Sequence, residues 1–130
     1  MIGAVTLLVV DYDAGIAFFV GALGFDLIED TKLSEEKRWV RVAPRDGGMC
    51  LLLAKASTPE QVACIGKQTG GRVGFFLHTD DFDTDYARFV AAGVRFERAP
   101  ITEAYGAVAV FEDVSGNLWD LIGPTPASPS

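Results

Sequence analysis

The sequence predicts an α+β fold in which two βαβββ modules form an open, cup-shaped and antiparallel-rich sheet within a single domain. The first observation is that strand-like and helix-like segments follow one another twice in the same β-α-β-β-β order. The second is that a shift of seventy residues places Asp11 on Asp81 and Phe19 on Phe89. The same shift aligns four further identities, which begin in the first half at Asp13, Ala17, Val20 and Ala22. Six identities in phase favour an internal duplication over two unrelated strand–helix units.

Composition limits the class of protein and its partners. A chain of 130 residues with 49% hydrophobic and 22% charged residues is expected to be globular. The net charge of −7 argues against nucleic acid and anionic membranes as partners. The N-terminus lacks the basic segment of a signal peptide, and no apolar run reaches the roughly 20 residues of a membrane span. Because Cys50 and Cys64 suggest neither a disulfide nor a metal spacing, we expect a cytoplasmic location.

The first module is expected at about residues 3–55. The β-branched run Ala4–Val10 predicts a strand, and Asp13 is the expected N-cap of a helix that ends at Gly24. The following strands are expected at Phe25–Ile28, Arg38–Ala43 and Met49–Ala54. Within the last of these, Cys50 is interpreted as a small buried apolar side chain.

The second module is expected at about residues 72–123, after a polar linker at 56–71 that contains one possible helical turn. Its predicted elements repeat the first module: a strand at Arg72–Thr79, a helix from Asp80 to Gly93, and strands at Val94–Arg98, Ala107–Glu112 and Leu118–Ile122. Residues 124–130 are expected to form a frayed tail.

The turn Asp113–Asn117 joins the last two predicted strands, with Asp for side-chain capping and Gly-Asn for positive φ. Alternation around it is expected to place Ala107, Ala109, Phe111, Leu118 and Asp120 on one face, and Val108, Val110, Trp119 and Leu121 on the other. Asp120 is then a lone acid in an apolar strand. It is either a strand-end residue that reaches water or a group held for chemistry.

Several segments resemble one known family. They are VVDYDAGIAFFVGALGFDL, RWVRVAP, GGRVGFFLHTDD, AAGVRF and YGAVAVFEDVSGNLWDLI. Together they resemble the vicinal oxygen chelate superfamily, which includes glyoxalase I, bleomycin- and fosfomycin-resistance proteins and extradiol dioxygenases. The resemblance extends from Ala4 to Gly123, and its most specific parts are the D…LGF segment and the F-x-D-x-x-G-N-x-W turn. It implies paired modules that form a cup, usually completed by dimerisation, so a homodimer is expected.

The resemblance also implies where a divalent metal would bind. The four ligand positions of metal-dependent members fall here on Ala4, Leu52, Phe75 and Asp120, of which only Asp120 could bind a metal. Because a divalent ion needs several ligands, no metal cofactor is expected unless Asp120 and His78 converge. His78 is the only histidine and is expected on the helix side, although a register slip of one residue would move it into the cup.

The cup is expected to bind a small molecule. The predicted ligand-binding residues are Thr6, Trp39, Arg41, Leu52, Phe75, Tyr105, Phe111 and Asp120. Burying Arg41 without a partner is costly, which favours an open site over a filled cup. If Arg41 and Asp120 pair with each other, they form a structural bridge instead.

Three functions follow from this reading. The first is metal-free binding of a small aromatic or amphipathic molecule. The second is metal-dependent lyase or dioxygenase activity, or metal-free catalysis with Asp120 as the base and best catalytic candidate. The third is a non-catalytic structural module with a filled cup.

Overall fold

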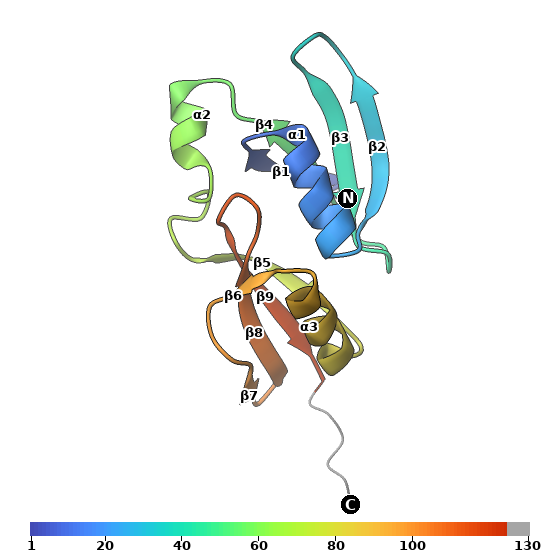
Figure 1. Cartoon of the computed structure of the whole chain (residues 1–130), viewed down its shortest axis with the longest axis vertical. Coiled ribbons are helices and arrows are strands. Elements are labelled where there is room, and N and C mark those ends of the chain that lie inside the picture. Colours follow the sequence, from blue (N-terminus) through green and yellow to red (C-terminus); the bar gives the residue numbers. More distant parts are fainter. Residues whose placement is uncertain (125–130) are drawn as a thin grey trace, which may run out of the picture.

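The computed structural model describes residues 1–124 and contains the two expected βαβββ modules. Figure 1 shows them one above the other along the long axis, each as a sheet with its own helix. The expected α+β fold with two open sheets is therefore confirmed. Most of the expected tail, from residue 125 onward, lies outside the described residues.

Module 1 forms a four-stranded sheet in the order β1-β4-β3-β2. Its elements are β1 (Ala4–Val9), α1 (Tyr12–Ile16), the π-helical η1 (Ala17–Ala22), β2 (Asp26–Lys32), β3 (Arg38–Ala43) and β4 (Cys50–Lys55). The expected N-cap was wrong, because Asp11 rather than Asp13 accepts a hydrogen bond from Ala14 N, at 3.0 Å. The helix begins earlier than expected, and Asp13 lies in its first turn, where a negative charge favours the helix dipole.

Module 2 follows α2 (Pro59–Cys64), the helical turn expected in the linker. Its strands form a sheet in the order β5-β9-β8-β6, with β7 also paired to β8. The elements are β5 (Val73–His78), α3 (Phe82–Ala91), β6 (Arg95–Phe96), β7 (Ile101–Glu103), β8 (Gly106–Glu112) and β9 (Leu118–Gly123). The sequence pattern missed β7, whose three residues are too few to show alternation.

The two modules contact each other through the sides of their sheets that carry the helices. Phe19 of η1 lies 5.7 Å from Trp119 of β9 between ring centroids, and Phe25 lies 6.3 Å from the same ring. Trp119 also stacks between Phe75 at 4.6 Å and Phe111 at 5.6 Å. One core therefore serves both modules, as neither half could bury enough apolar surface alone.

Polar contacts along the free edge of β1 add to this junction. The Gln68 side chain accepts from Leu8 N at 2.6 Å and donates to Thr6 O at 3.0 Å, which satisfies an otherwise unpaired strand edge. Ser115 Oγ, in the turn between β8 and β9, donates to Leu8 O at 2.7 Å. The linker and the last turn thus fasten module 2 to the first strand of module 1.

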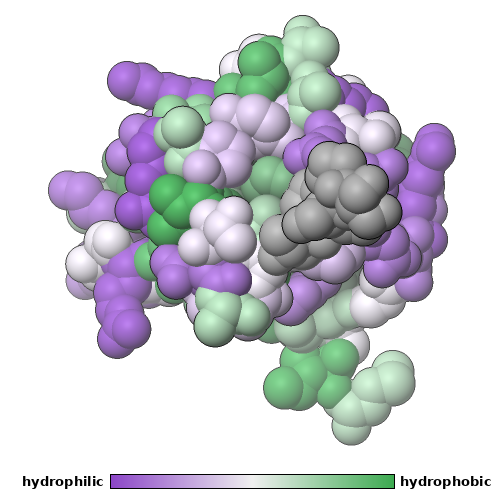
Figure 2. Space-filling model, turned by 90° about the horizontal axis from the view of Figure 1, so that it is seen from below, coloured by the Kyte–Doolittle hydropathy of each residue, from purple (hydrophilic) through white to green (hydrophobic). Residues whose placement is uncertain are grey.

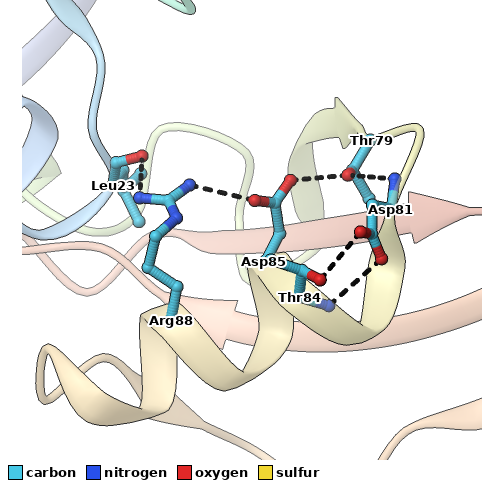
Figure 3. Close-up of polar contacts among 6 residues, drawn as sticks. All are labelled: Leu23, Thr79, Asp81, Thr84, Asp85 and Arg88. Carbon is cyan, nitrogen blue, oxygen red and sulfur yellow. Dashed lines mark hydrogen bonds and ion pairs between the residues drawn. The ribbon is translucent and has the colours of Figure 1, made fainter.

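Arg88 of α3 makes a second polar connection between the modules (Figure 3). Its Nη1 donates to Leu23 O at 3.1 Å, and its Nη2 donates to Asp85 Oδ1 at 3.1 Å. Asp85 in turn accepts from Thr79 Oγ1. Gly24 has φ +78°, and a Cβ at this position would lie 2.8 Å from Arg88 Nη1. The backbone conformation therefore favours glycine here, and a Cβ would also force the end of the Arg88 side chain to shift.

The surface seen from the module 2 end has hydrophilic side chains around smaller hydrophobic patches (Figure 2). Among residues 1–124, no helix is long and apolar enough to cross a membrane.

Candidate ligand-binding site

Each sheet has an open face, defined here as the face turned away from the helices. On the module 1 sheet, the ladder pairs Thr6 with Leu52 and Leu52 with Arg41. Arg41 is paired in turn with Glu29 of β2. Residues that are directly paired on neighbouring strands point to the same face. Thr6, Leu52, Arg41 and Glu29 therefore form one row across this open face.

Arg41 is held by Glu29 and not by Asp120. Its Nε donates to Glu29 Oε1 at 3.1 Å, its Nη2 forms an ion pair with the same oxygen at 3.0 Å, and its Nη1 lies 3.8 Å from Cys50 Sγ. The alternative in which Arg41 and Asp120 pair as a structural bridge therefore does not apply. The sequence reading missed Glu29 because the predicted strand ended at Ile28, whereas β2 continues to Lys32.

Trp39 lies on the same open face, since it is paired with Thr31 next to the pair of Arg41 and Glu29. It is 40% exposed, an unusual exposure for a tryptophan in a strand. Leu52 and Cys50 are partly exposed on this face, so the interpretation of Cys50 as a core residue was wrong. The open face of module 1 is an accessible surface with one aromatic ring and one ion pair.

On the module 2 sheet, the expected faces were partly wrong. The ladder pairs Val110 with Asp120 and Phe111 with Trp119, so Asp120 shares the face of Val110. Phe111 is fully buried on the helix side, where it packs against Phe89 and Trp119. Ala107 and Ala109 also lie in the core. The five-residue turn makes Glu112 pair with Leu118, and alternation within each strand cannot reveal that register.

The same correction applies to β5. Phe76 is paired with Asp120, and His78 with Ile122, which places both side chains on the open face. Phe75 instead stacks on Trp119 and packs against the core. The expected positions of Phe75 in the cup and of His78 on the helix side were therefore wrong. Phe76, which is 58% exposed, is the aromatic residue that the sequence reading missed on this face.

The remaining predicted residue, Tyr105, lies in the turn between β7 and β8 and is 67% exposed. The structure therefore keeps Thr6, Trp39, Arg41, Leu52 and Asp120 on open faces, leaves Tyr105 at a loop, and assigns Phe75 and Phe111 to the core. Trp39 and Asp120 belong to different sheets. Within one chain these sheets meet through their helix sides, so the open faces remain exposed.

The open face of module 2 contains two acids, Glu112 and Asp120, whose pKa is raised. Burial raises the pKa of Asp120 above its ordinary value, and the nearby Arg98 partly opposes this effect. The neighbouring carboxyl of Glu97, together with burial, raises the pKa of Glu112. Asp120 lies between the apolar side chains of Phe76 and Val110 in the ladder, which is consistent with an acid that is incompletely solvated.

The side chains do not fit a divalent metal site of the kind that the resemblance implies. Ala4 and Leu52 offer no donor, and the open face of β5 presents Gly74, Phe76 and His78. Among the described residues, no three His, Cys, Asp or Glu side chains gather closely enough to hold a metal ion. His78 and Asp120 share a face but are not directly paired. Two donors from one sheet do not complete a coordination shell.

Comparison with known proteins agrees with this architecture. A profile of the Glyoxalase/Bleomycin resistance protein/Dioxygenase superfamily matches residues 1–121. An uncharacterized protein from Shewanella frigidimarina (strain NCIMB 400) is 56% identical over 120 residues, covering 91% of this chain and 89% of that protein.

Among solved structures, UcmS2 is 32% identical with a TM-score of 0.81, over 94% of this chain and 96% of UcmS2. TnmS3, an antibiotic binding protein from Streptomyces sp. CB03234, is 30% identical with a TM-score of 0.76, over 96% of each chain. The profile match, the sequence relative and the paired βαβββ modules lead to one conclusion. The chain belongs to the Glyoxalase/Bleomycin resistance protein/Dioxygenase superfamily.

Proposed function

We propose that this protein binds a small aromatic or amphipathic molecule on the open faces of its sheets, without a metal ion. The observation that carries the proposal is the exposure of Trp39 on β3 and Phe76 on β5, two large aromatic side chains on open sheet faces. A single exposed ring is common on a protein surface, but contiguous exposed apolar surface marks a binding site, and a dimer that brings the two faces together would join these rings into such a surface. The similarity to TnmS3, an antibiotic binding protein, supports a small-molecule ligand. A cup filled by its own side chains would leave these rings buried.

The proposed site is completed by a second copy of the chain. Each sheet has one open face. A ligand held between two such faces is better shielded from water than a ligand bound to a single face. A homodimer that brings the module 1 face of one copy against the module 2 face of its partner would supply both walls. Light scattering at micromolar concentration tests this arrangement. A monomer under these conditions would contradict it.

Arg41 and Asp120 are the proposed polar determinants of the two faces. Glu29 engages Nε and Nη2 of Arg41, which leaves Nη1 with only the weak sulfur contact to Cys50. A ligand carboxylate or carbonyl can therefore accept from Nη1 without breaking the ion pair. Asp120 can accept from a hydroxyl or an amine of the ligand. Arg41→Met should weaken an anionic ligand by roughly 2–5 kcal/mol and a neutral aromatic ligand much less.

The test begins with a thermal-shift screen of aromatic compounds, followed by calorimetry of the best ligand. Trp39→Ala and Phe76→Ala should each weaken binding about tenfold or more, because aromatic anchors carry much of the binding energy. Val62→Ala on α2 is the matched control, since Val62 is also an exposed apolar residue (56%) but lies outside both sheets. If both aromatic variants bind like the wild type and the control, the open faces are not the site.

A further inference from the structure

A cleft between the two modules is separate from the row of Thr6, Leu52, Arg41 and Glu29 and from Asp120. It consists of two adjoining cavities of about 620 Å³ each, which share Phe25, Pro44, Asp46, Leu77, His78 and Asp80 in their walls. Small-molecule sites commonly have volumes of about 300–1,000 Å³ and often lie between domains or repeats. We call this feature the junction cleft.

One half of the junction cleft is aromatic and apolar. Module 1 contributes Phe25, Met49 and Leu51, and module 2 contributes Phe75, Phe76 and Trp119. Phe75 is stacked face to face on Trp119 with an interplanar angle of 19°, and Phe111 stacks on Trp119 as well, so the partly exposed ring of Phe75 is the one that a ligand can approach. Leu51, Phe75 and Trp119 belong to the helix sides of the sheets, Phe25 and Met49 directly precede β2 and β4, and Phe76 reaches the cleft from the open face of β5. A planar ring system is the ligand shape that suits such a wall.

The charged side chains around the cleft favour a positively charged ligand. Its two arginines are already engaged, Arg45 by Asp26 at 3.7 Å and Arg88 by Leu23 O and Asp85 at 3.1 Å. By contrast, Asp46 and Asp80 line both cavities, and no residue of the described part of the chain forms a salt bridge with either. A cation in the cleft would gain both carboxylates and the faces of the aromatic rings.

We propose that the junction cleft binds a planar aromatic cation, with its ring against Phe75 and Phe76 and its positive charge toward Asp46 and Asp80. Such a ligand contacts both modules at once, so its binding also stabilises their packing. The cleft shares Phe76 and His78 with the open face of β5, whereas Asp46 and Asp80 line the cleft and Trp39 and Arg41 lie on the open face of the other sheet. Substitutions at these unshared residues therefore distinguish the two proposals.

Proflavine, a planar aromatic cation, is a suitable probe, with calorimetry at about 0.15 M salt to limit long-range charge effects. The double variant Asp46→Asn/Asp80→Asn should weaken proflavine binding about threefold to tenfold, because each carboxylate is exposed and contributes modestly. Glu35→Gln/Glu36→Gln in the turn between β2 and β3 removes the same net charge far from the cleft. This control should change the affinity by less than about twofold.

Two further measurements test where the probe binds. His78 is the single histidine of the chain and lines both cavities, so its imidazole proton resonances should shift with the same dissociation constant as calorimetry reports. Because His78 also lies on the open face of β5, substitutions on each surface are needed to separate the two sites. Met49→Gln, at a half-exposed cleft position, should also weaken binding, while Trp39→Ala on the open face should not.

The outcomes separate this proposal from the proposed function. Weaker binding in the cleft variants, together with unchanged binding in Trp39→Ala, supports the junction cleft. No proflavine binding up to about 1 mM, or equal affinity in the wild type and the cleft variants, overturns it. If Trp39→Ala alone abolishes binding, the probe occupies the open faces, which supports the proposed function and refutes the cleft.

Discussion

Replacing Asp113 with alanine should destabilise the protein more than any surface change, because one buried carboxylate organises the turn between β8 and β9. Asp113 Oδ1 accepts from Ser115 N at 2.9 Å and from Asn117 N at 3.0 Å. Its Oδ2 accepts from Asn117 Nδ2 at 3.1 Å and from Trp119 Nε1 at 2.9 Å. Asp113, Asn117 and Trp119 are 6%, 3% and 4% exposed, so water is a poor substitute for this acceptor.

The magnitude follows from the donors that the alanine variant leaves unpaired. Trp119 Nε1 and Asn117 Nδ2 would be buried side-chain donors without an acceptor, and each such group costs about 1–3 kcal/mol. The two backbone donors of the turn lose a charge-assisted partner as well, although they are closer to solvent. A total loss of about 3–5 kcal/mol is expected, a large part of the roughly 5–15 kcal/mol stability of an ordinary domain.

Urea unfolding monitored by tryptophan fluorescence measures this loss as a change in midpoint at constant m-value. Asp113→Asn keeps the size and one acceptor oxygen, so it should fall between the wild type and the alanine variant. Asp46→Ala serves as the control, because Asp46 is an exposed acid in another turn. A loss below about 1 kcal/mol in Asp113→Ala would show that the network contributes no more than an ordinary hydrogen bond, and would refute the reasoning.

Three further predictions concern Gly24, Asp120 and the metal content of the protein. Gly24→Ala should destabilise the protein by about 1–3 kcal/mol in chemical denaturation, and clearly more than Gly47→Ala. Both glycines have positive φ, but only at Gly24 would a Cβ meet Arg88; equal losses would contradict a role for that contact. Because burial raises the pKa of Asp120 above its ordinary 3.8, the folded state binds more protons, and stability should fall as pH rises above 3.8. Thermal unfolding of Asp120→Asn should lack this decline, and an unchanged pH profile would count against it. Elemental analysis should find no stoichiometric transition metal; about one equivalent per chain, lost on mutating Asp120 or His78, would disprove metal-free binding.

The amino-acid sequence by itself determined the architecture of the protein. The repeated order of strands and helices, with aspartates before and glycines after each helix, was sufficient to predict two βαβββ modules. These signals are local, since a cap or an apolar stripe depends on residues within one or two turns of the chain. The turn Asp113–Asn117 was predicted for the same reason, and the structure shows Asp113 as the acceptor that holds it. Small errors, such as Asp13 for Asp11 as the N-cap, concern boundaries alone.

Only the tertiary structure decided which residues of each strand lie on the open face of its sheet. In β5, adjacent apolar residues Phe75 and Phe76 give no period-2 signal, so either could have been assigned to the open face. Pairing with β9 settles the choice, because Phe76 lies beside Asp120 whereas Phe75 stacks on Trp119. The partner of Arg41 could not be predicted from the sequence either, because Glu29 of β2 contacts Arg41 of β3 across the pairing between the two strands. Strand register and the junction cleft depend on contacts between distant parts of the chain, and a shift of one residue exchanges the faces of a whole strand.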